Sequence, residues 1–371
     1  MQTPVHCRPL ATLTAPKPFL AQANGGRRGS GWHRERLCPS CAAAVQGPLQ
    51  KNRLLFAAVE ALFSFQPFFA LAAKQAKNKI AQRGRDIGVD ISAEVAALAA
   101  GADWEAELEA VQDASLAYPA YYTQPFHAYP AGNLCWEAAL EVNSVARAVH
   151  APVMDPSGRA MDPGGDAALR AAFSGRLREL MGEERAVSVR DIVDCGCATG
   201  LSTLELRRRF PDARSLTGVD LSPHFLAVAR VTQRRRGHGA EEAGGAHEPL
   251  TFVHAAAEAT GMPAASADLV TACLACHELP AAATREMLAE ARRILRPGGA
   301  MAIMEMDPAS AAFQRVFGNP FAYAAFKSTE PWLLEYAALD VPGALREAGF
   351  VSVRKESASP RHFTVVAFKP K

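Results

Sequence analysis

The chain has 371 residues, of which 49% are hydrophobic, and its 40 basic residues nearly balance its 38 acidic ones. A chain of this length corresponds to one or two domains of about 150 residues each, with enough apolar content for a full core. The near-zero net charge gives no support for a nucleic-acid-binding surface, so no nucleic-acid partner is expected.

Residues 1–50 differ in composition from the rest of the chain. They are basic and almost free of acids, they are rich in Ala, Pro, Gly, Ser and Thr, and they lack periodicity. This composition is typical of an organelle transit peptide, and the alternative is a disordered tail. Cys38 and Cys41 form a CxxC pair with no second pair and no neighbouring histidines, so we expect no metal site.

Residues 54–85 combine an apolar run with a basic stretch. Residues 54–73 are mostly apolar and residues 74–85 carry the basic side chains. Pro67 interrupts the apolar run, so a membrane span is the least favoured interpretation. The preferred interpretation is a pair of helices packed on the following domain, and the alternative is peripheral contact with an anionic membrane surface. A small helical piece is expected at 92–111.

Residues 118–141 are the most aromatic part of the chain. Their prolines and Gly132 predict a loop, and Asn133 is expected to cap a helix that continues to residue 149. Rigid aromatic residues on a loop beside a ligand-binding domain indicate a lid or a pocket wall, and the alternative is a loop pinned to the surface by its own aromatic rings. The candidate substrate-binding residues are Tyr121, Tyr122, Phe126 and Trp136.

After a predicted helix at 167–181, strands and helices alternate regularly. Parallel strands joined by right-handed crossovers, followed by a hairpin, predict an α/β fold. It is a Rossmann-like, mostly parallel sheet of seven strands with helices on both faces and an N-terminal helical extension. We expect a helical extension at 51–160 and the sheet domain at 161–371. The predicted strands are 190–194, 216–220, 250–255, 268–274, 300–305, 351–357 and 362–369, the helices between them are 201–210, 223–236, 281–294 and 331–348, and 237–249 is a low-complexity loop.

The stretch VDCGCATGLSTLEL at 193–206 is the feature around which this domain is organised. Asp194 ends an apolar strand and is followed by Gly196, Ala198 and Gly200 at alternate positions, and then by a helical pattern. A strand, a tight turn and a helix start let the backbone approach a nucleotide-like ligand closely. The next strand ends in Asp220, about twenty residues later, where an acid can accept both hydroxyls of a ribose.

Four motifs in residues 190–305 resemble those of class I S-adenosylmethionine-dependent methyltransferases. They are the D-x-G-x-A-x-G turn at 194–200, the acid Asp220, the pair Ala257-Glu258, and Leu-Arg-Pro-Gly-Gly at 295–299. The resemblance implies S-adenosylmethionine as cofactor, held at its methionine end and ribose by the turn, with Asp220 on the ribose hydroxyls and the third motif beside the adenine. The implied cofactor-binding residues are Asp194, Gly196, Cys197, Ala198, Gly200, Asp220, Leu221, Ala257, Glu258 and Leu274.

Two positions depart from the family pattern. Ala198 replaces the middle glycine of the turn, and Ala256 stands where an adenine-facing acid is frequent, which leaves the adenine amino group to Glu258 or to the backbone. A nicotinamide dehydrogenase is disfavoured, because it would require G-x-G-x-x-G after the strand.

The aromatic loop and the basic helix at 74–85 resemble a plastid and cyanobacterial subgroup of the small-molecule (type 11) methyltransferases. This resemblance, together with the N-terminal composition, implies a chloroplast location, with the mitochondrion as the alternative. Residues 274–277 read Leu-Ala-Cys-His, which differs from the motif of amino-group methylation and favours O- or C-methylation of a small, lipophilic or aromatic acceptor. A non-catalytic cofactor-binding protein and an rRNA or protein methyltransferase are the alternatives.

His277 follows the fourth predicted strand, where this fold directs side chains toward the transferred methyl group. Its imidazole could accept a proton near neutral pH, and the alternative is a histidine that caps a helix or hydrogen-bonds beneath the cofactor. His127 is the second candidate base. His254 is expected at a strand end without a chemical role, and the oligomeric state cannot be read from the sequence.

Overall fold

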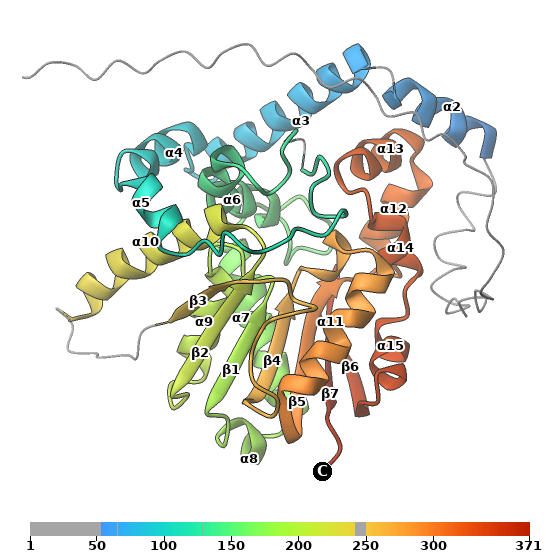
Figure 1. Cartoon of the computed structure of the whole chain (residues 1–371). Helices are drawn as coiled ribbons and strands as arrows, with labels where there is room; N and C mark the ends of the chain where they lie inside the picture. The colour runs from blue at the N-terminus through green and yellow to red at the C-terminus, as the bar shows by residue number, and fades with distance from the viewer. Residues whose placement is uncertain (1–52, 65, 128, 242–249) are drawn as a thin grey trace, which may run out of the picture. The chain divides into compact units, whose positions relative to one another are not determined.

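A seven-stranded sheet with the order β3-β2-β1-β4-β5-β7-β6 organises the protein (Figure 1). The computed structural model describes residues 53–64, 66–127, 129–241 and 250–371, all within one unit, Leu37–Lys371. Strands β1 to β5 are parallel and β7 is antiparallel to β5 and β6, which confirms the predicted fold. The strands are β1 (Asp191–Cys195), β2 (Ser215–Asp220), β3 (Thr251–His254), β4 (Ala267–Cys273), β5 (Leu295–Met306), β6 (Val351–Ser359) and β7 (His362–Phe368).

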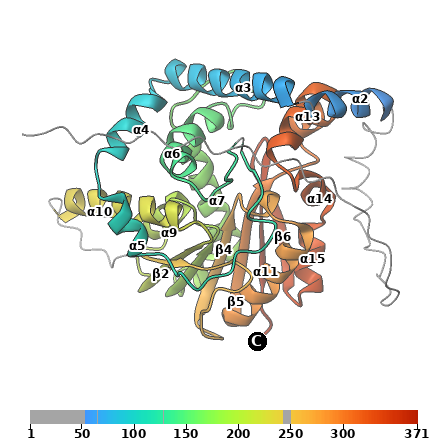
Figure 2. The same cartoon turned by 45° about the horizontal axis from the view of Figure 1, so that its top comes forward.

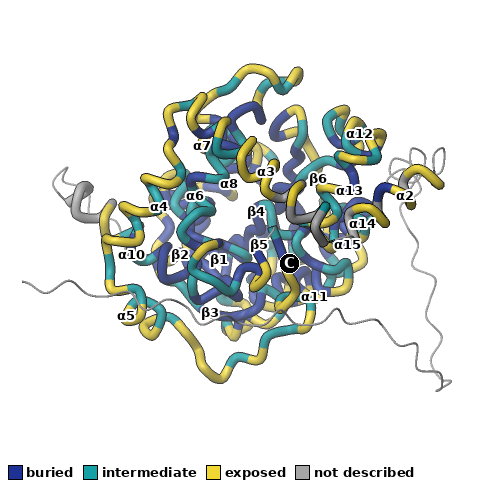
Figure 3. The backbone as a smooth tube through the Cα atoms, turned by 90° about the horizontal axis from the view of Figure 1, so that it is seen from above, coloured by how far each residue is buried: buried dark blue, intermediate teal, exposed yellow. Residues whose placement is uncertain are grey.

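Helices cover both faces of the sheet because each strand sends successive side chains to opposite sides. Ile192 of β1 joins the core beneath α7 (Gly165–Met181) and α9 (Leu201–Arg209). Its neighbour Val193 joins the core beneath α11 (Ala281–Ile294) and α15 (Val341–Glu347). In Figure 3 the tube through the central strands is mostly dark blue, since both faces are covered. A short α8 (Glu183–Ala186) precedes β1, and α10 (Pro223–Glu241) packs on β2 and β3.

The N-terminal helices pack on this domain, as the preferred interpretation of residues 54–85 predicts. In Figures 1 and 2, α2 lies beside α13 and α3 lies beside α6. Lys77 of α3 forms an ion pair of 2.9 Å with Glu137 of α6. Within the described residues, none of the helices combines the length and hydropathy that a membrane crossing requires. These helices are α2 (Arg53–Ser64), α3 (Gln66–Asp86), α4 (Ile91–Ala99), α5 (Trp104–Glu109) and α6 (Trp136–His150).

The single helix expected at 331–348 is wrong. The chain after β5 instead forms α12 (Ala311–Gly318), α13 (Pro320–Thr329), α14 (Leu333–Ala338) and α15. Pro342 lies at the start of α15, where its missing N–H is harmless, but it would break a helix that continued through it. These helices carry a small apolar core of their own above the end of β5.

Asn133 is not the cap of α6. That helix begins at Trp136, and its N-cap, Cys135, makes no capping hydrogen bond through its side chain. Asn133 is buried and donates instead to Glu278. Residues 237–241 of the predicted loop at 237–249 belong to α10, which ends at Glu241. Residues 242–249 lie outside the described residues, as do residues 1–50 with the expected transit peptide.

Candidate functional site

The turn between β1 and α9 has the backbone conformation that its small residues predict. Gly196, Ala198 and Gly200 all have positive φ values, of 67°, 47° and 80°. A Cβ atom on Gly196 would lie 2.9 Å from the Cβ of Ala275, so this position has no room for a side chain. Ala198 pays the strain of a left-handed conformation, which indicates that the surrounding structure fixes this turn.

Asp194 lies beneath the turn and is fully buried. One of its carboxylate oxygens accepts hydrogen bonds from the Ser202 and Thr203 hydroxyls of α9, and the other accepts from Thr271 of β4. Burial raises the pKa of Asp194, and the three hydroxyls oppose this shift. In this structure Asp194 therefore fixes the turn against α9 and β4.

Asp220 joins the end of β2 to the turn. Its carboxylate accepts hydrogen bonds from the backbone N–H groups of Ala198 and Ser222, each at 2.8 Å. Burial raises the pKa of Asp220 to about 6, although both amides stabilise the charged form. The Tyr122 hydroxyl lies 3.4 Å from the same carboxylate. Asp220 is thus a buried acceptor that faces both the turn and the aromatic loop.

The aromatic loop crosses the carboxyl ends of β2 and β3. Because β7 is antiparallel to β5 and the chain ends at the bottom of Figure 1, the parallel strands end at the top, where this loop runs. His254, at the end of β3, accepts a hydrogen bond from the Asp113 N–H at 2.9 Å, and the Tyr118 hydroxyl lies 3.1 Å from its other ring nitrogen. His254 therefore anchors the start of the loop, at the strand end where it is expected.

Tyr121 and Tyr122 lie beside the predicted cofactor residues, and their predicted role in binding the acceptor stays a prediction. The Tyr121 hydroxyl donates to Glu258 Oε1 at 2.5 Å, as Tyr122 approaches Asp220. Trp136 packs against Trp104 and His224, with ring centroids 5.4 and 4.7 Å away. Of the other predicted residues, Ala257 and Glu258 follow β3 and Leu274 follows β4. Cys197 and Leu221 are buried. The Phe126 ring packs on His127.

His127 and His277 meet in a cluster with three glutamates. His127 comes from the loop, His277 and Glu278 from the 3₁₀ turn η1 (Cys276–Glu278) after β4, Glu305 from β5, and Glu330 from the end of α13. His277 Nδ1 lies 2.9 Å from both Glu305 oxygens, and His127 Nε2 lies 2.8 Å from Glu330 Oε1. The two candidate bases, far apart in sequence, are therefore neighbours.

The carboxylates of this cluster favour positive charge on the histidines. Burial opposes the imidazolium of His277, but Glu305 outweighs burial and raises the pKa of His277 to about 10. The Glu305 carboxylate thus favours the imidazolium form of His277 over the neutral ring, and the role of this ring as a base stays a prediction. Burial also opposes the charge on His127, and Glu330 outweighs it, so the pKa of His127 is raised. Burial raises the pKa of Glu278 to about 7.

Arg170 is a site residue that sequence patterns do not reveal. It projects from α7 and pairs with Asp166 at 3.0 Å, and its Nη1 lies 3.8 Å from the Cys273 sulfur at the end of β4. Burial lowers the pKa of Arg170, but the charges of Asp166 and Asp194 contribute to a net rise. The Arg170 guanidinium thus lies close to the glycine turn. In the sequence, Arg170 cannot be distinguished from any other polar residue of a helix.

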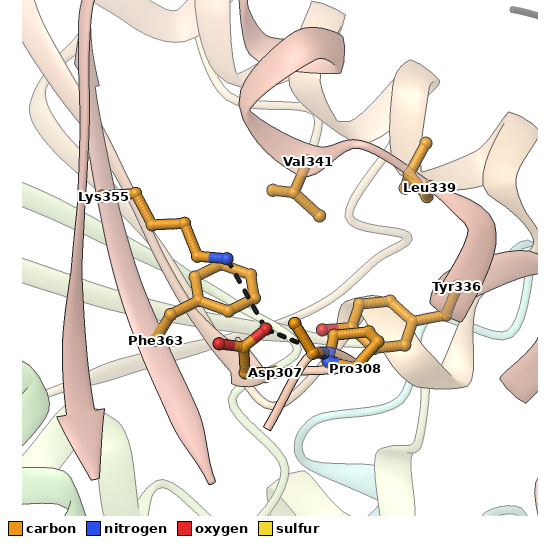
Figure 4. A pocket seen from close by; sticks show the side chains of 8 residues that line it. Asp307, Pro308, Tyr336, Leu339, Val341, Lys355 and Phe363 are labelled. Carbon is orange, nitrogen blue, oxygen red and sulfur yellow. Dashed lines mark hydrogen bonds and ion pairs between the residues drawn. The ribbon is translucent and has the colours of Figure 1, made fainter. Parts of the chain in front are cut away.

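A cavity of about 150 Å³ opens next to the carboxyl end of β5 (Figure 4). Tyr336 lines it and also packs edge-on against the His277 ring, with centroids 6.2 Å apart. Lys355 Nζ lies 4.1 Å from the centre of the Phe363 ring and 3.6 Å from Asp307 Oδ1. Tyr336 is therefore shared between the lining of this cavity and the surroundings of His277.

Part of the chain is similar to known methyltransferases. Residues 192–299 match the family described as "Methyltransferase domain". The chain is 36% identical over 111 residues to the malonyl-[acyl-carrier protein] O-methyltransferase of Hahella chejuensis, covering 29% of this chain and 34% of that protein. It is 26% identical over 192 residues to an uncharacterized methyltransferase of Synechocystis, covering 51% of this chain and 80% of that protein. A solved putative O-methyltransferase of Nostoc punctiforme aligns with a TM-score of 0.43 and 17% identity, over 72% of this chain and 67% of that one.

The chain thus spans about a third of the length of the Hahella relative. The family match covers the turn after β1, Asp220 at the end of β2, and the motif at 295–299 that begins β5. Residues 192–299 are therefore similar to a methyltransferase domain.

Proposed function

We propose that the whole protein is an S-adenosylmethionine-dependent methyltransferase that acts on a small acceptor. Bound S-adenosylmethionine supplies an electrophilic methyl group, so the protein's task is to align the acceptor and exclude water. The observation that carries the proposal is Asp220, a buried carboxylate fixed by two backbone amides at the end of β2 and next to the glycine turn.

Three residues are suited to holding the cofactor. Asp220 would accept the ribose hydroxyls, as charge-assisted hydrogen bonds. Glu258 Oε2 is buried and makes no hydrogen bond in the structure, so it is free to accept one from the adenine side. Arg170 places a cation near the turn and would attract the carboxylate of the methionine end. These groups fit the polar ends of S-adenosylmethionine.

The acceptor is proposed to be a small, lipophilic or aromatic molecule that is methylated on oxygen or carbon. Such an acceptor loses a proton, and the buried glutamates around His277 provide groups that can receive it, directly or through the His277–Glu305 pair. The Hahella relative is described as an O-methyltransferase, which supports oxygen as the acceptor atom.

A plastid location and contact with a membrane surface extend the proposal. The basic, acid-poor composition of residues 1–50 and the Synechocystis relative support the plastid. Leu54, Leu55 and Leu71 are exposed on α2 and α3, and the exposed basic residues Lys74 and Lys79 follow them. Apolar and basic side chains together suit the interface of an anionic membrane.

Calorimetric titration of the full-length protein with S-adenosylhomocysteine tests the proposal. We expect Asp220→Asn to weaken binding by about 10- to 100-fold, since an amide replaces a charged acceptor. Asp212→Asn, an exposed acid in the turn after α9, is the matched control and should bind as wild type. Failure of the folded wild-type protein to bind, or unchanged affinity in folded Asp220→Asn, would contradict the proposed function.

A further inference from the structure

His127, His277 and Glu278 form a set that could hold a metal ion. One potential ligand atom from each of the three residues lies within 4.8 Å of the others. A cation bound at about 2.0–2.2 Å requires opposite ligand atoms roughly 4.4 Å apart or less, so small side-chain movements would close the set. Two imidazoles and one carboxylate are the ligand set of mononuclear Fe²⁺ sites that keep open coordination positions.

Each of the three residues has a partner that fixes its orientation. His277 Nδ1 is held by Glu305, and this contact leaves Nε2 for a ligand bond. His127 Nε2 is held by Glu330, and Asn133 Nδ2 donates to Glu278 Oε2 at 3.1 Å. Metal-binding histidines characteristically donate their second N–H to a carboxylate, which orients the ring and raises its basicity. The cluster has this feature at both histidines.

The burial of the carboxylates also suits a bound cation. Glu305 is 0% exposed and Glu330 is 4% exposed. Glu330 Oε2 is buried and accepts no hydrogen bond, although Oε1 contacts His127. A buried carboxylate oxygen without a partner is costly, and a cation within its reach would remove that cost.

The loop conformation brings His127 to the cluster. The His127 backbone is left-handed, with a φ of 49°, and its N–H donates to the Thr329 carbonyl at 3.0 Å. Thr329 directly precedes Glu330, so the contact fixes the loop against the residue that pairs with the His127 ring. A strained backbone held in this way is characteristic of a functional constraint.

The cluster is also connected to the predicted cofactor strand. The Asn133 side chain donates to Glu278, and the Asn133 backbone carbonyl accepts a hydrogen bond from the Ser222 hydroxyl. The Ser222 N–H in turn donates to Asp220. One short chain of hydrogen bonds therefore joins the carboxylate expected to hold the ribose to Glu278.

We propose that His127, His277 and Glu278 bind a divalent cation of the Mn²⁺ or Fe²⁺ type, with Glu330 beside them. Three protein ligands leave open positions on such a cation, which can hold an acceptor through one or two oxygen atoms and lower the pKa of a bound hydroxyl. This role rests on the proposed methyltransferase function, whereas binding of the cation does not. The preferred acceptor then presents an ionisable oxygen, as a phenol or an enol does.

Titration of the whole chain with Mn²⁺ tests the site. The signal of free Mn²⁺ in electron paramagnetic resonance measures how much of the ion remains unbound. Mn²⁺ is the probe because thiolates, such as those of Cys38 and Cys41, select softer metals. We expect the wild type to bind one equivalent that is lost, or weakened at least about tenfold, in both His127→Gly and Glu278→Gln. Glycine accepts the positive φ of residue 127, and glutamine keeps the shape of residue 278.

His224→Gln is the matched control. This histidine lies on α10 and packs against Trp136, so its substitution should leave Mn²⁺ binding unchanged. Titration of each variant with S-adenosylhomocysteine reports whether the variant is folded. Because this ligand tests the proposed function and Mn²⁺ tests the cation site, the two proposals can fail independently. If the wild type binds S-adenosylhomocysteine but does not bind Mn²⁺, the cation site is overturned and the proposed function is not. Equal Mn²⁺ binding by wild type and both folded variants would overturn it as well.

Discussion

At the scale of single residues, the site depends on carboxylates at the strand ends, of which Asp220 and Glu305 are buried and Glu258 and Glu278 are partly buried. Asp220, Glu258, Glu278 and Glu305 each lie at or just beyond the end of a strand, and each is held by a hydrogen-bond donor. A buried carboxylate is sensitive to its partners because the medium around it screens charge poorly. Local changes in protonation should therefore be visible in ligand binding.

Asp220 should make cofactor binding pH-dependent. Burial raises its pKa to about 6, so it gains its charge as the pH rises through that value. Tyr122 and Asp194 are the neighbouring titratable groups, and the Ala198 and Ser222 amides face the carboxylate. Since ribose hydroxyls need a charged acceptor, affinity for S-adenosylhomocysteine should rise by about tenfold between pH 5 and pH 7.

Calorimetry across this pH range measures the effect, and Asp220→Asn is the control, since an amide does not titrate. A clearly flatter profile in the variant is expected. Profiles of equal slope in the two proteins would assign the pH dependence to another group.

At the scale of elements, the aromatic loop acts as a cover held at several points. Its start is anchored by His254, its tyrosines reach Asp220 and Glu258, and its end is held through His127 by α13. A loop with polar anchors and few strand contacts belongs to the less stable parts of a fold, and it can open without unfolding the sheet. The role of this loop as a lid stays a prediction.

His254→Ala should loosen the start of the loop. The change leaves the Asp113 N–H without its acceptor and the Tyr118 hydroxyl without its ring partner. We expect hydrogen exchange in residues 113–122 to accelerate by about tenfold, which corresponds to about 1.4 kcal/mol of local opening free energy. Hydrogen exchange followed by mass spectrometry measures the rate.

Tyr118→Phe removes only one of the two contacts and should have a smaller effect on the same peptides. Faster exchange spread evenly over the sheet strands in His254→Ala would point to global destabilisation and would contradict a local anchor.

At the scale of the whole molecule, the buried sheet links stability to the protonation of core histidines. His362 opens β7, is 6% exposed, and contacts the Ser359 hydroxyl at 2.8 Å. Burial, with His150, His277 and Arg361 nearby, lowers its pKa to about 3. The histidine is therefore neutral in the folded protein over most of the acidic range.

This shift predicts a loss of stability in acid. Because the folded pKa of His362 lies below the ordinary value of 6.5, the unfolded chain binds more protons between these values, so its contribution to stability falls as the pH drops below about 6.5. The loss is at most about 1.4 kcal/mol per pH unit. His362→Gln should reduce the slope of the free energy of unfolding between pH 6.5 and pH 4.5, as measured by urea unfolding. Slopes that match in wild type and variant would contradict the prediction.

The sequence by itself determined the sheet and the positions of the glycine turn and Asp220 at its strand ends. Strand and helix patterns, the glycine turn and Asp220 are local features, since a few neighbouring residues dictate burial period and backbone conformation. The predicted strands therefore fall within a few residues of β1 to β7, apart from the early start of β5. The prediction of a single helix at 331–348 was wrong because Pro342 lies at the start of α15, so this segment forms the two helices α14 and α15.

Only the tertiary structure decided which distant segments meet. The placement of Tyr121 and Tyr122 against Glu258 and Asp220, and of His127 against the segment around His277, depends on how the loop packs over the strand ends. The surroundings of Glu305 and Arg170 also depend on tertiary packing. In the sequence, Glu305 is one residue of a strand pattern and Arg170 is one residue of an ordinary helix. Periodicity reports which side of an element is buried, whereas contacts between elements, and the pKa shifts they cause, exist only once the chain is packed.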